Sequence, residues 1–160
     1  MTLRWPALVA ASLVFTSCAL VNPPIAQRTT QGPMAEDMWT YRMALQNGRT
    51  PNYDERQRWD ADISRRVDAY LREHPDAANA PDVTAFRFWR QPAVGMTKEQ
   101  VLLLLDAPAL VTTDQDAMSQ LAGKFWPLLE GNVTEAWAYL EGWQFYFAGQ
   151  RVVDILQIAK

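Results

Sequence analysis

Side chains that commonly perform acid–base or metal chemistry are scarce in this sequence. His74 is the only histidine and Cys18 the only cysteine, so the chain alone supplies neither a His–Cys metal site nor a Cys–His catalytic pair. His74 precedes a proline in a connecting segment, which favours a solvated helix end over a catalytic base. Neighbouring acids such as Asp60 and Asp62 are two residues apart, a spacing that places their carboxylates on different faces of a helix. Because no glycine-rich phosphate loop is present either, we predict no enzymatic activity, no metal and no cofactor.

The lone cysteine follows an apolar segment. Residues 5–15 are mostly apolar; they are too few to cross a bilayer of roughly 30 Å but suit the central region of a secretory signal. The sequence Phe-Thr-Ser-Cys that ends at Cys18 resembles a bacterial lipobox, in which a large apolar residue and two small ones precede a lipidated cysteine. We predict that residues 1–17 are a signal peptide and that Cys18 carries the lipid. The alternatives are that Cys18 is a small hydrophobic residue, or that cleavage follows Ala19.

The predicted lipid determines the predicted location. Each buried CH₂ of an acyl chain contributes about 0.8 kcal/mol to membrane binding, and several chains make the anchor stable. Alanine rather than aspartate follows Cys18, which is typical of an outer-membrane destination. Residues 18–33 contain three prolines and no helical period, so we expect a tether. The chain is therefore predicted to be held at the outer membrane by its lipid, with its domain facing the periplasm.

Size and charge exclude some partners. The chain has 160 residues and a formal net charge of −3, which suits one folded domain and provides no basic surface for nucleic acid. The arginines between residues 42 and 90 are interleaved with acids, a pattern that predicts solvated mixed-charge helix faces. We expect envelope proteins as partners, the membrane only through the lipid, and no nucleic acid.

Residues 34–81 have the pattern of a helical extension. Apolar residues recur along residues 34–46, and Asn47-Gly48 follows as a helix end. A second helix is expected to begin after Asn52, which is its N-cap, with Glu55 three residues on. It is expected to bury Trp59, Ile63 and Val67, whose spacing is four. A short third helix is expected near residue 82, and another, late in the chain, is expected to break at Pro127.

The residues Gly95-Met96-Thr97 introduce a short apolar helix. Thr97 followed three residues later by Gln100 matches a capping box, in which each side chain bonds the other residue's backbone N–H. Met96 and Val101 occupy the two positions of a hydrophobic staple, and Gly95 permits a sharp turn before the cap. We interpret these five residues as a structural corner without chemistry of its own.

The end of the chain changes to strand patterns. Residues 135–140, 143–148 and 151–158 are rich in aromatic and β-branched residues, and Glu141-Gly142 and Gly149-Gln150 separate them. Two-residue connections with glycine are typical of tight hairpins. The sequence thus predicts an α+β fold in which N-terminal helices are followed by a three-stranded antiparallel meander packed on helices.

Two-residue connections also predict which side chains share a face. They place Trp137, Tyr139 and Tyr146 together on one face, opposite a mostly apolar core face. This aromatic face is either a partner-binding surface or the surface on which the N-terminal helices pack. Asp154 falls on the core face, which requires a bulge or a position at the sheet edge.

The corner and the strands together resemble a known family. Gly-Met-Thr-x-x-Gln-Val, a preceding short helix and the C-terminal meander are similar to the SmpA/OmlA (BamE-like) family of small outer-membrane lipoproteins, over residues 82–157. The resemblance implies an ααβββ domain, here residues 82–160, that acts by protein–protein contact as a scaffold or accessory factor in outer-membrane protein assembly. Asp106 stands where the family usually has glycine. The alternative is an envelope binding or inhibitor module unrelated to barrel assembly.

Overall fold

The computed structural model describes residues 25–129 and 132–159, so the predicted signal peptide and Cys18 lie outside the described residues. The fold is α+β, as predicted, but its antiparallel sheet has five strands rather than three. In spatial order the strands are β1 (Ile25–Thr29), β5 (Arg151–Ala159), β4 (Trp143–Ala148), β3 (Glu135–Ala138) and β2 (Leu110–Thr112).

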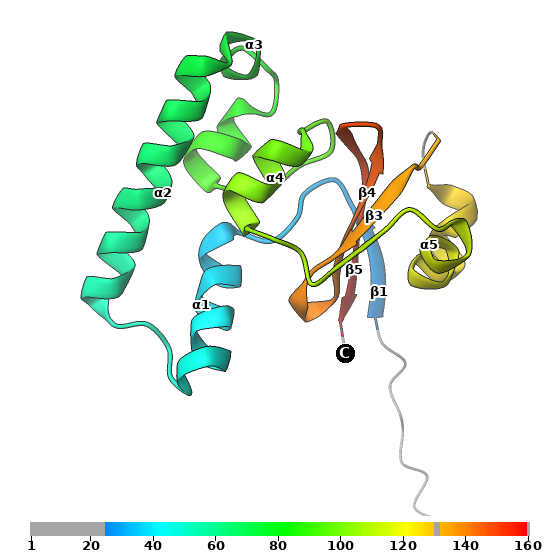
Figure 1. Cartoon of the computed structure of the whole chain (residues 1–160), viewed down its shortest axis with the longest axis horizontal. Coiled ribbons are helices and arrows are strands. Elements are labelled where there is room, and N and C mark those ends of the chain that lie inside the picture. Colours follow the sequence, from blue (N-terminus) through cyan, green and yellow to red (C-terminus); the bar gives the residue numbers. More distant parts are fainter. Residues whose placement is uncertain (1–24, 130–131, 160) are drawn as a thin grey trace, which may run out of the picture.

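Helices cover both faces of the sheet (Figure 1). One layer contains α1 (Ala35–Asn47), α2 (Tyr53–Glu73), α3 (Pro75–Ala78), the π-helical turn η1 (Ala85–Trp89) and α4 (Lys98–Leu105). The other contains α5 (Gln115–Ala122) and the 3₁₀ helix η2 (Gly123–Leu128). The 3₁₀ turn η3 (Leu140–Gly142) connects β3 to β4. None of the described helices is long and apolar enough to cross a membrane.

Each face of the sheet has its own hydrophobic core. The larger core joins α1, α2, η1 and α4 to the sheet, and its fully buried side chains include Met38, Ile63, Phe86, Val101 and Phe145. The smaller core, which includes Met118, Tyr146 and Leu156, lies under α5 and η2. Because the larger core spans residues on both sides of the expected boundary at 81/82, the helices of residues 34–81 and the rest of the chain form one packed unit.

The edge strand β1 lies within residues 18–33, which were expected to form a tether. Instead, Ile25 to Thr29 pair with β5, and the Gly32 N–H donates to the Pro92 carbonyl at 2.8 Å. A Cβ on Gly32 would lie 2.7 Å from the Phe145 ring, so this segment is packed closely against the core. The predicted tether of residues 18–33 is therefore wrong from residue 25 onward. An edge strand pairs with one neighbour only, so its side chains need little of the apolar alternation that identifies a central strand.

The predicted corner is present. The Gln100 N–H donates to the Thr97 hydroxyl at 3.2 Å, and the Thr97 N–H donates to Gln100 Oε1 at 2.9 Å. Met96 and Val101 are fully buried, and Gly95 has a φ of +97°. The corner is also paired with the β4–β5 hairpin, because the Gly95 N–H donates to the carbonyl of Val152.

The β3–β4 connection is one residue longer than predicted. Trp137 pairs with Phe145, and the Tyr139 N–H donates to the Trp143 carbonyl at 2.8 Å, so the connection is the three residues of η3. Because side chains alternate along a strand, this shift of one residue moves all of β3 to the opposite face relative to β4.

The β4–β5 connection has the predicted two residues, followed by a bulge. Phe147 pairs with Val152 but Tyr146 pairs with Asp154, which leaves Val153 as the extra residue. The bulge accounts for Asp154, because it moves this side chain off the larger core and onto the face of Tyr146. There Asp154 is 2% exposed and accepts from Arg28 Nε at 2.8 Å.

Candidate protein-binding surface

The three aromatic residues predicted to form a partner surface are buried. Trp137 is 5% exposed, Tyr139 6% and Tyr146 0%. They do not share a face, because Trp137 and Tyr139 belong to the larger core and Tyr146 to the smaller. The prediction of one aromatic face is wrong, and its cause is the longer β3–β4 connection. For Trp137 and Tyr139, the alternative of a surface covered by helices is what the structure contains.

The hydroxyl groups of the two buried tyrosines form hydrogen bonds inside the protein. The Tyr139 hydroxyl donates to the Asp106 carbonyl at 2.9 Å, and the Tyr146 hydroxyl donates to Gln144 Oε1 at 2.7 Å. Burial raises the pKa of both tyrosines, and for Tyr146 the nearby Asp154 carboxylate raises it further. Both hydroxyls therefore stay protonated as structural donors.

The lone histidine lies at a helix end. His74 Nδ1 is 3.0 Å from the Tyr70 carbonyl, so this nitrogen carries the proton and donates. Its ring stacks on Tyr70, with centroids 4.1 Å apart, and its Nε2 is 4.0 Å from Glu99. Within residues 25–129 and 132–159, no three His, Cys, Asp or Glu side chains form a group suited to a metal ion.

Two aromatic side chains project from the π-helical turn η1. Phe88 is 69% exposed and Trp89 54% exposed, whereas Ala85 and Phe86 at the start of the same turn are buried. The wide turn ends at Arg90, which has a φ of +50°. A π-helical turn departs from the α-helical spacing and occurs frequently at functional sites. Here it buries the first aromatic of the Phe-Arg-Phe-Trp sequence and exposes the other two.

Arg90 holds this turn against the first two helices. Its Nη2 donates to the Ser64 hydroxyl at 2.7 Å, and its Nη1 donates to Asp60. Its carbonyl accepts from the Ala35 N–H at 3.0 Å. The guanidinium lies over the Trp59 ring, 5.8 Å from the centroid. The positions of Phe88 and Trp89 are thus determined by contacts to α1 and α2.

Further apolar side chains lie around Arg90. Trp59 stacks on Trp39 with centroids 5.1 Å apart, and both are half-buried. Met34, 48% exposed, immediately precedes the residue that bonds to Arg90. We call this set the aromatic surface; its members are Met34, Trp39, Trp59, Phe88 and Trp89. Tryptophan and arginine are the residues most enriched among interface hot spots.

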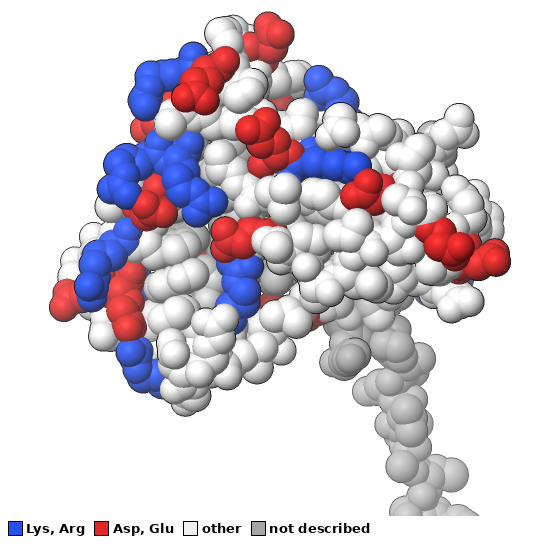
Figure 2. All heavy atoms as spheres, viewed as in Figure 1, with Lys and Arg blue, Asp and Glu red and all other residues white. Residues whose placement is uncertain are grey.

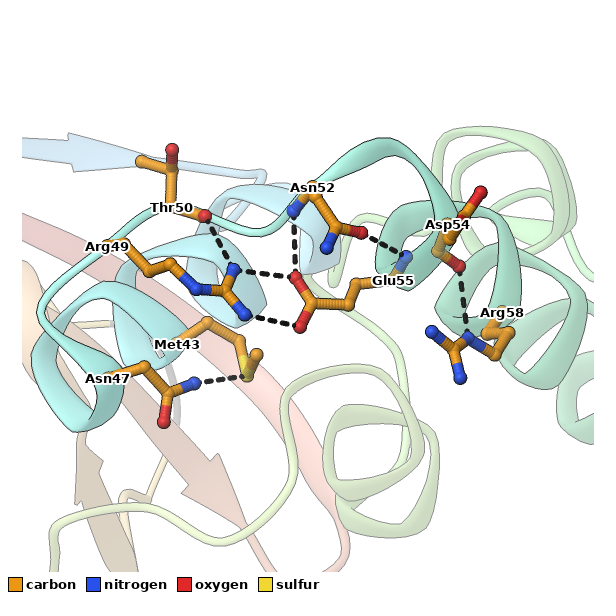
Figure 3. A network of polar contacts seen from close by, with 8 residues as sticks. All are labelled: Met43, Asn47, Arg49, Thr50, Asn52, Asp54, Glu55 and Arg58. Carbon is orange, nitrogen blue, oxygen red and sulfur yellow. Dashed lines mark hydrogen bonds and ion pairs between the residues drawn. The ribbon is translucent and has the colours of Figure 1, made fainter.

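A network of polar contacts lies in the connection between α1 and α2 (Figure 3). Arg49 bonds both carboxylate oxygens of Glu55, at 2.7 and 2.8 Å. Glu55 also accepts from the Asn52 N–H, and Asn52 caps α2. The Arg49 guanidinium, and then the Asn52 N–H, lower the pKa of Glu55 to about 2. The network thus joins the connection to the first turn of α2.

Asp106 has a backbone conformation that glycine normally adopts. Its φ is 59° and its ψ is −162°, a region nearly exclusive to glycine and costly for other residues. Arg42 Nη2 donates to its carboxylate at 2.8 Å, and Arg66 lies 3.7 Å away. These two arginines, from α1 and α2, stabilise the strained residue at the end of α4.

Charged side chains are unevenly distributed over the surface. On the face shown in Figure 2, blue and red side chains are interleaved over α2, while the surface over the sheet is largely neutral. The mixed-charge helix faces expected from the sequence are therefore present. On α2 several of the arginines pair with acids one turn away or on a neighbouring element, as Arg65 pairs with Asp62.

The fold and this surface define an α+β domain with exposed aromatic residues on its helical layer. A scan of the chain against protein-family models finds no match. Searches of curated proteins and of solved structures find no significant match either.

The aromatic surface was not predicted from the sequence, although the spacing of three aromatic residues indicated it. The segment around residue 82 was expected to be a short third helix. Phe86, Phe88 and Trp89 are spaced by two and one residues, and one face of a short helix does not hold all three. At least one of them therefore had to be exposed or to occupy an irregular turn.

Proposed function

We propose that this protein is a cell-envelope lipoprotein that acts by protein–protein contact and not by catalysis. The observation that supports this most is the exposure of Phe88 and Trp89 on a turn fixed by Arg90. Exposing two neighbouring aromatics to water has no benefit for folding, whereas burying them against a partner provides a large apolar contact.

The lipobox-like sequence supports the proposed location at the outer membrane. Cys18 lies seven residues before the first described residue, Ile25. Seven extended residues reach at most about 25 Å. In Figure 1, β1 begins at the same end of the molecule as the C-terminus. A lipid on Cys18 would therefore keep this end of the domain close to the periplasmic face of the membrane.

A role as scaffold or accessory factor in outer-membrane protein assembly is the finer version of the proposal. It is supported by the resemblance to the SmpA/OmlA family. The Gly95 corner has the capped geometry that its motif requires, and Asp106 adopts a glycine-type conformation at the position where that family has glycine.

An envelope binding or inhibitor module unrelated to barrel assembly is the second candidate. One observation favours it. Three members of the aromatic surface lie in or next to the first two helices: Met34 precedes α1, Trp39 lies in α1 and Trp59 lies in α2. These helices lie outside the segment that resembles the family. Three of the five members of the aromatic surface thus lie outside that segment, while Phe88 and Trp89 lie inside it.

The experiment is capture of partners by the full-length protein from detergent-solubilised envelope, with variants of the aromatic surface. Trp89→Ala and Phe88→Ala should each reduce the captured protein by tenfold or more, because a hot-spot aromatic contributes about 2 kcal/mol or more. Leu128→Ala is the matched control, since the exposure of Leu128, 58%, lies between those of Trp89 and Phe88, but the residue lies in η2 on the other layer. If Trp89→Ala and Phe88→Ala capture as much protein as the wild type and the control, the aromatic surface is not the contact site.

A further inference from the structure

A hollow of about 320 Å³ lies between the end of α2 and the segment that leads into η1. Its lining includes two arginines and one acid, together with apolar side chains; the residues are Asp68, Leu71, Arg72, Ala78, Val83 and Arg87. Two guanidinium groups and one carboxylate leave one net positive charge in the hollow.

The two arginines differ in their contacts. Arg87 forms an exposed ion pair with Asp68 at 3.2 Å, an interaction that contributes at most about 1 kcal/mol. Among the residues that the structure describes, the side chain of Arg72 makes no hydrogen bond, ion pair or ring contact. The neighbouring acids Asp76 and Asp82 line a different hollow, beside His74. The guanidinium of Arg72 is thus available to an anion from outside.

The hollow adjoins the aromatic surface. The Arg87 guanidinium lies 5.6 Å from the centre of the Phe88 ring, so one side chain borders both features. A ligand bound to the Arg87 guanidinium would therefore lie beside the exposed Phe88 ring. Cationic and apolar recognition elements are therefore contiguous here.

We propose that the hollow and the aromatic surface together bind a partner segment in which an Asp or Glu lies next to a large apolar side chain. The carboxylate pairs with Arg72 and Arg87, and the apolar side chain packs on Phe88 and Trp89. Charge complementarity selects this occupant, because guanidinium groups bind carboxylates in paired, charge-assisted hydrogen bonds. The inference rests on the proposed function and names the chemistry of its partner.

The test is a selection of random 12-residue peptides displayed on phage, with the purified full-length protein in mild detergent as the target. Enriched peptides should carry an acid beside an aromatic or large aliphatic residue. Their affinity should fall by tenfold or more on the Arg72→Gln/Arg87→Gln variant, and it should weaken as salt rises through the range in which surface charges are screened. Trp89→Ala should weaken the same peptides.

Arg58→Gln/Arg65→Gln is the matched control, because it removes the same charge from exposed positions elsewhere on α2. It should leave peptide affinity within about twofold of the wild type. No enrichment, or enriched peptides that bind the Arg72→Gln/Arg87→Gln variant as tightly as the wild type, would overturn the inference.

Failure of this inference is distinguishable from failure of the proposed function. If capture from the envelope depends on Trp89 but is unchanged in Arg72→Gln/Arg87→Gln, the protein contact stands and the acidic segment does not. If neither variant affects capture, the aromatic surface itself is rejected.

Discussion

The most unusual single residue is Asp106. It has a positive φ outside the usual left-handed region, at the end of a helix whose carbonyl groups disfavour a negative charge. Arg42 and Arg66 approach its carboxylate, and the Tyr139 hydroxyl donates to its carbonyl. These contacts connect α1, α2 and the residue that follows β3 at one position, so the backbone strain is compensated by interactions between elements.

Asp106→Gly and Asp106→Ala separate the strain from the ion pairs. Both variants lose the carboxylate, but only glycine adopts this conformation without a Cβ clash. We expect the glycine variant to unfold with a free energy at least about 1 kcal/mol higher than that of the alanine variant. At an ordinary backbone position alanine is the more stable of the two, by about 0.4–1 kcal/mol. Urea denaturation measures the difference, and an alanine variant as stable as the glycine variant would contradict the strain.

At the scale of elements, the β3–β4 connection determines which side chains the sheet buries on each face. Gly142 has a φ of +78°, and a Cβ built on it would lie 1.9 Å from the Ile158 carbonyl oxygen of β5. Gly149, in the other connection, has a φ of +60° with nothing within 4 Å of the added Cβ. Both glycines serve a turn, but only Gly142 also lies against a neighbouring strand.

Gly142→Ala should therefore destabilise the protein more than Gly149→Ala. The Gly149 variant incurs only the cost of a left-handed conformation, about 1 kcal/mol, whereas the Gly142 variant must also displace the backbone of β5. We expect a loss at least twice as large for Gly142→Ala, measured by chemical denaturation. Equal losses would mean that the connection does not pack on β5 as described.

The α1–α2 connection should make stability depend on acid pH. The pKa of Glu55 falls from an ordinary 4.5 to about 2 in the folded state. The stabilisation from Glu55 is therefore fully present above pH 4.5 and is lost as the pH falls toward 2. The melting temperature of Glu55→Gln should fall less than that of the wild type between these pH values. Glu36→Gln, at an exposed acid of α1 whose nearest cation is 3.9 Å away, is the control and should follow the wild type.

At the scale of the whole molecule, two helical layers enclose one sheet, and all three aromatics predicted to bind a partner stabilise its two cores. The aromatic surface around η1 is therefore the contact surface that we propose in their place. The predicted lipid at Cys18 lies close, along the chain, to the start of β1.

Cys18→Ala should release the protein from the membrane. Mass spectrometry of the wild type should find a diacylglyceryl group on Cys18 at the mature N-terminus, and the variant should appear in the soluble envelope fraction. The two acyl chains supply the predicted membrane affinity, and the fold from residue 25 onward should keep the same melting temperature. An unmodified N-terminus at Leu20 would contradict lipidation.

Local features of this protein were determined by the sequence itself. The Thr97–Gln100 capping box, the Asn52–Glu55 cap and the Gly149-Gln150 connection are each completed by residues within a few positions of one another. Neighbours in the chain satisfy their hydrogen bonds, so residue types and spacing were sufficient to predict them.

The other features of the fold depend on contacts between residues far apart in the chain, so only the tertiary structure determined them. β1 exists through pairing with β5, where Arg28 meets Asp154 across 126 positions. The β3–β4 connection has three residues and packs on β5, where a Cβ on Gly142 would lie 1.9 Å from the Ile158 carbonyl oxygen. The extra residue reversed the faces of Trp137 and Tyr139. The exposure of Phe88 and Trp89 depends on the hydrogen bonds that Arg90 donates to Asp60 and Ser64 of α2. Alternation along a strand specifies two faces, but only packing against other elements specifies which face is buried.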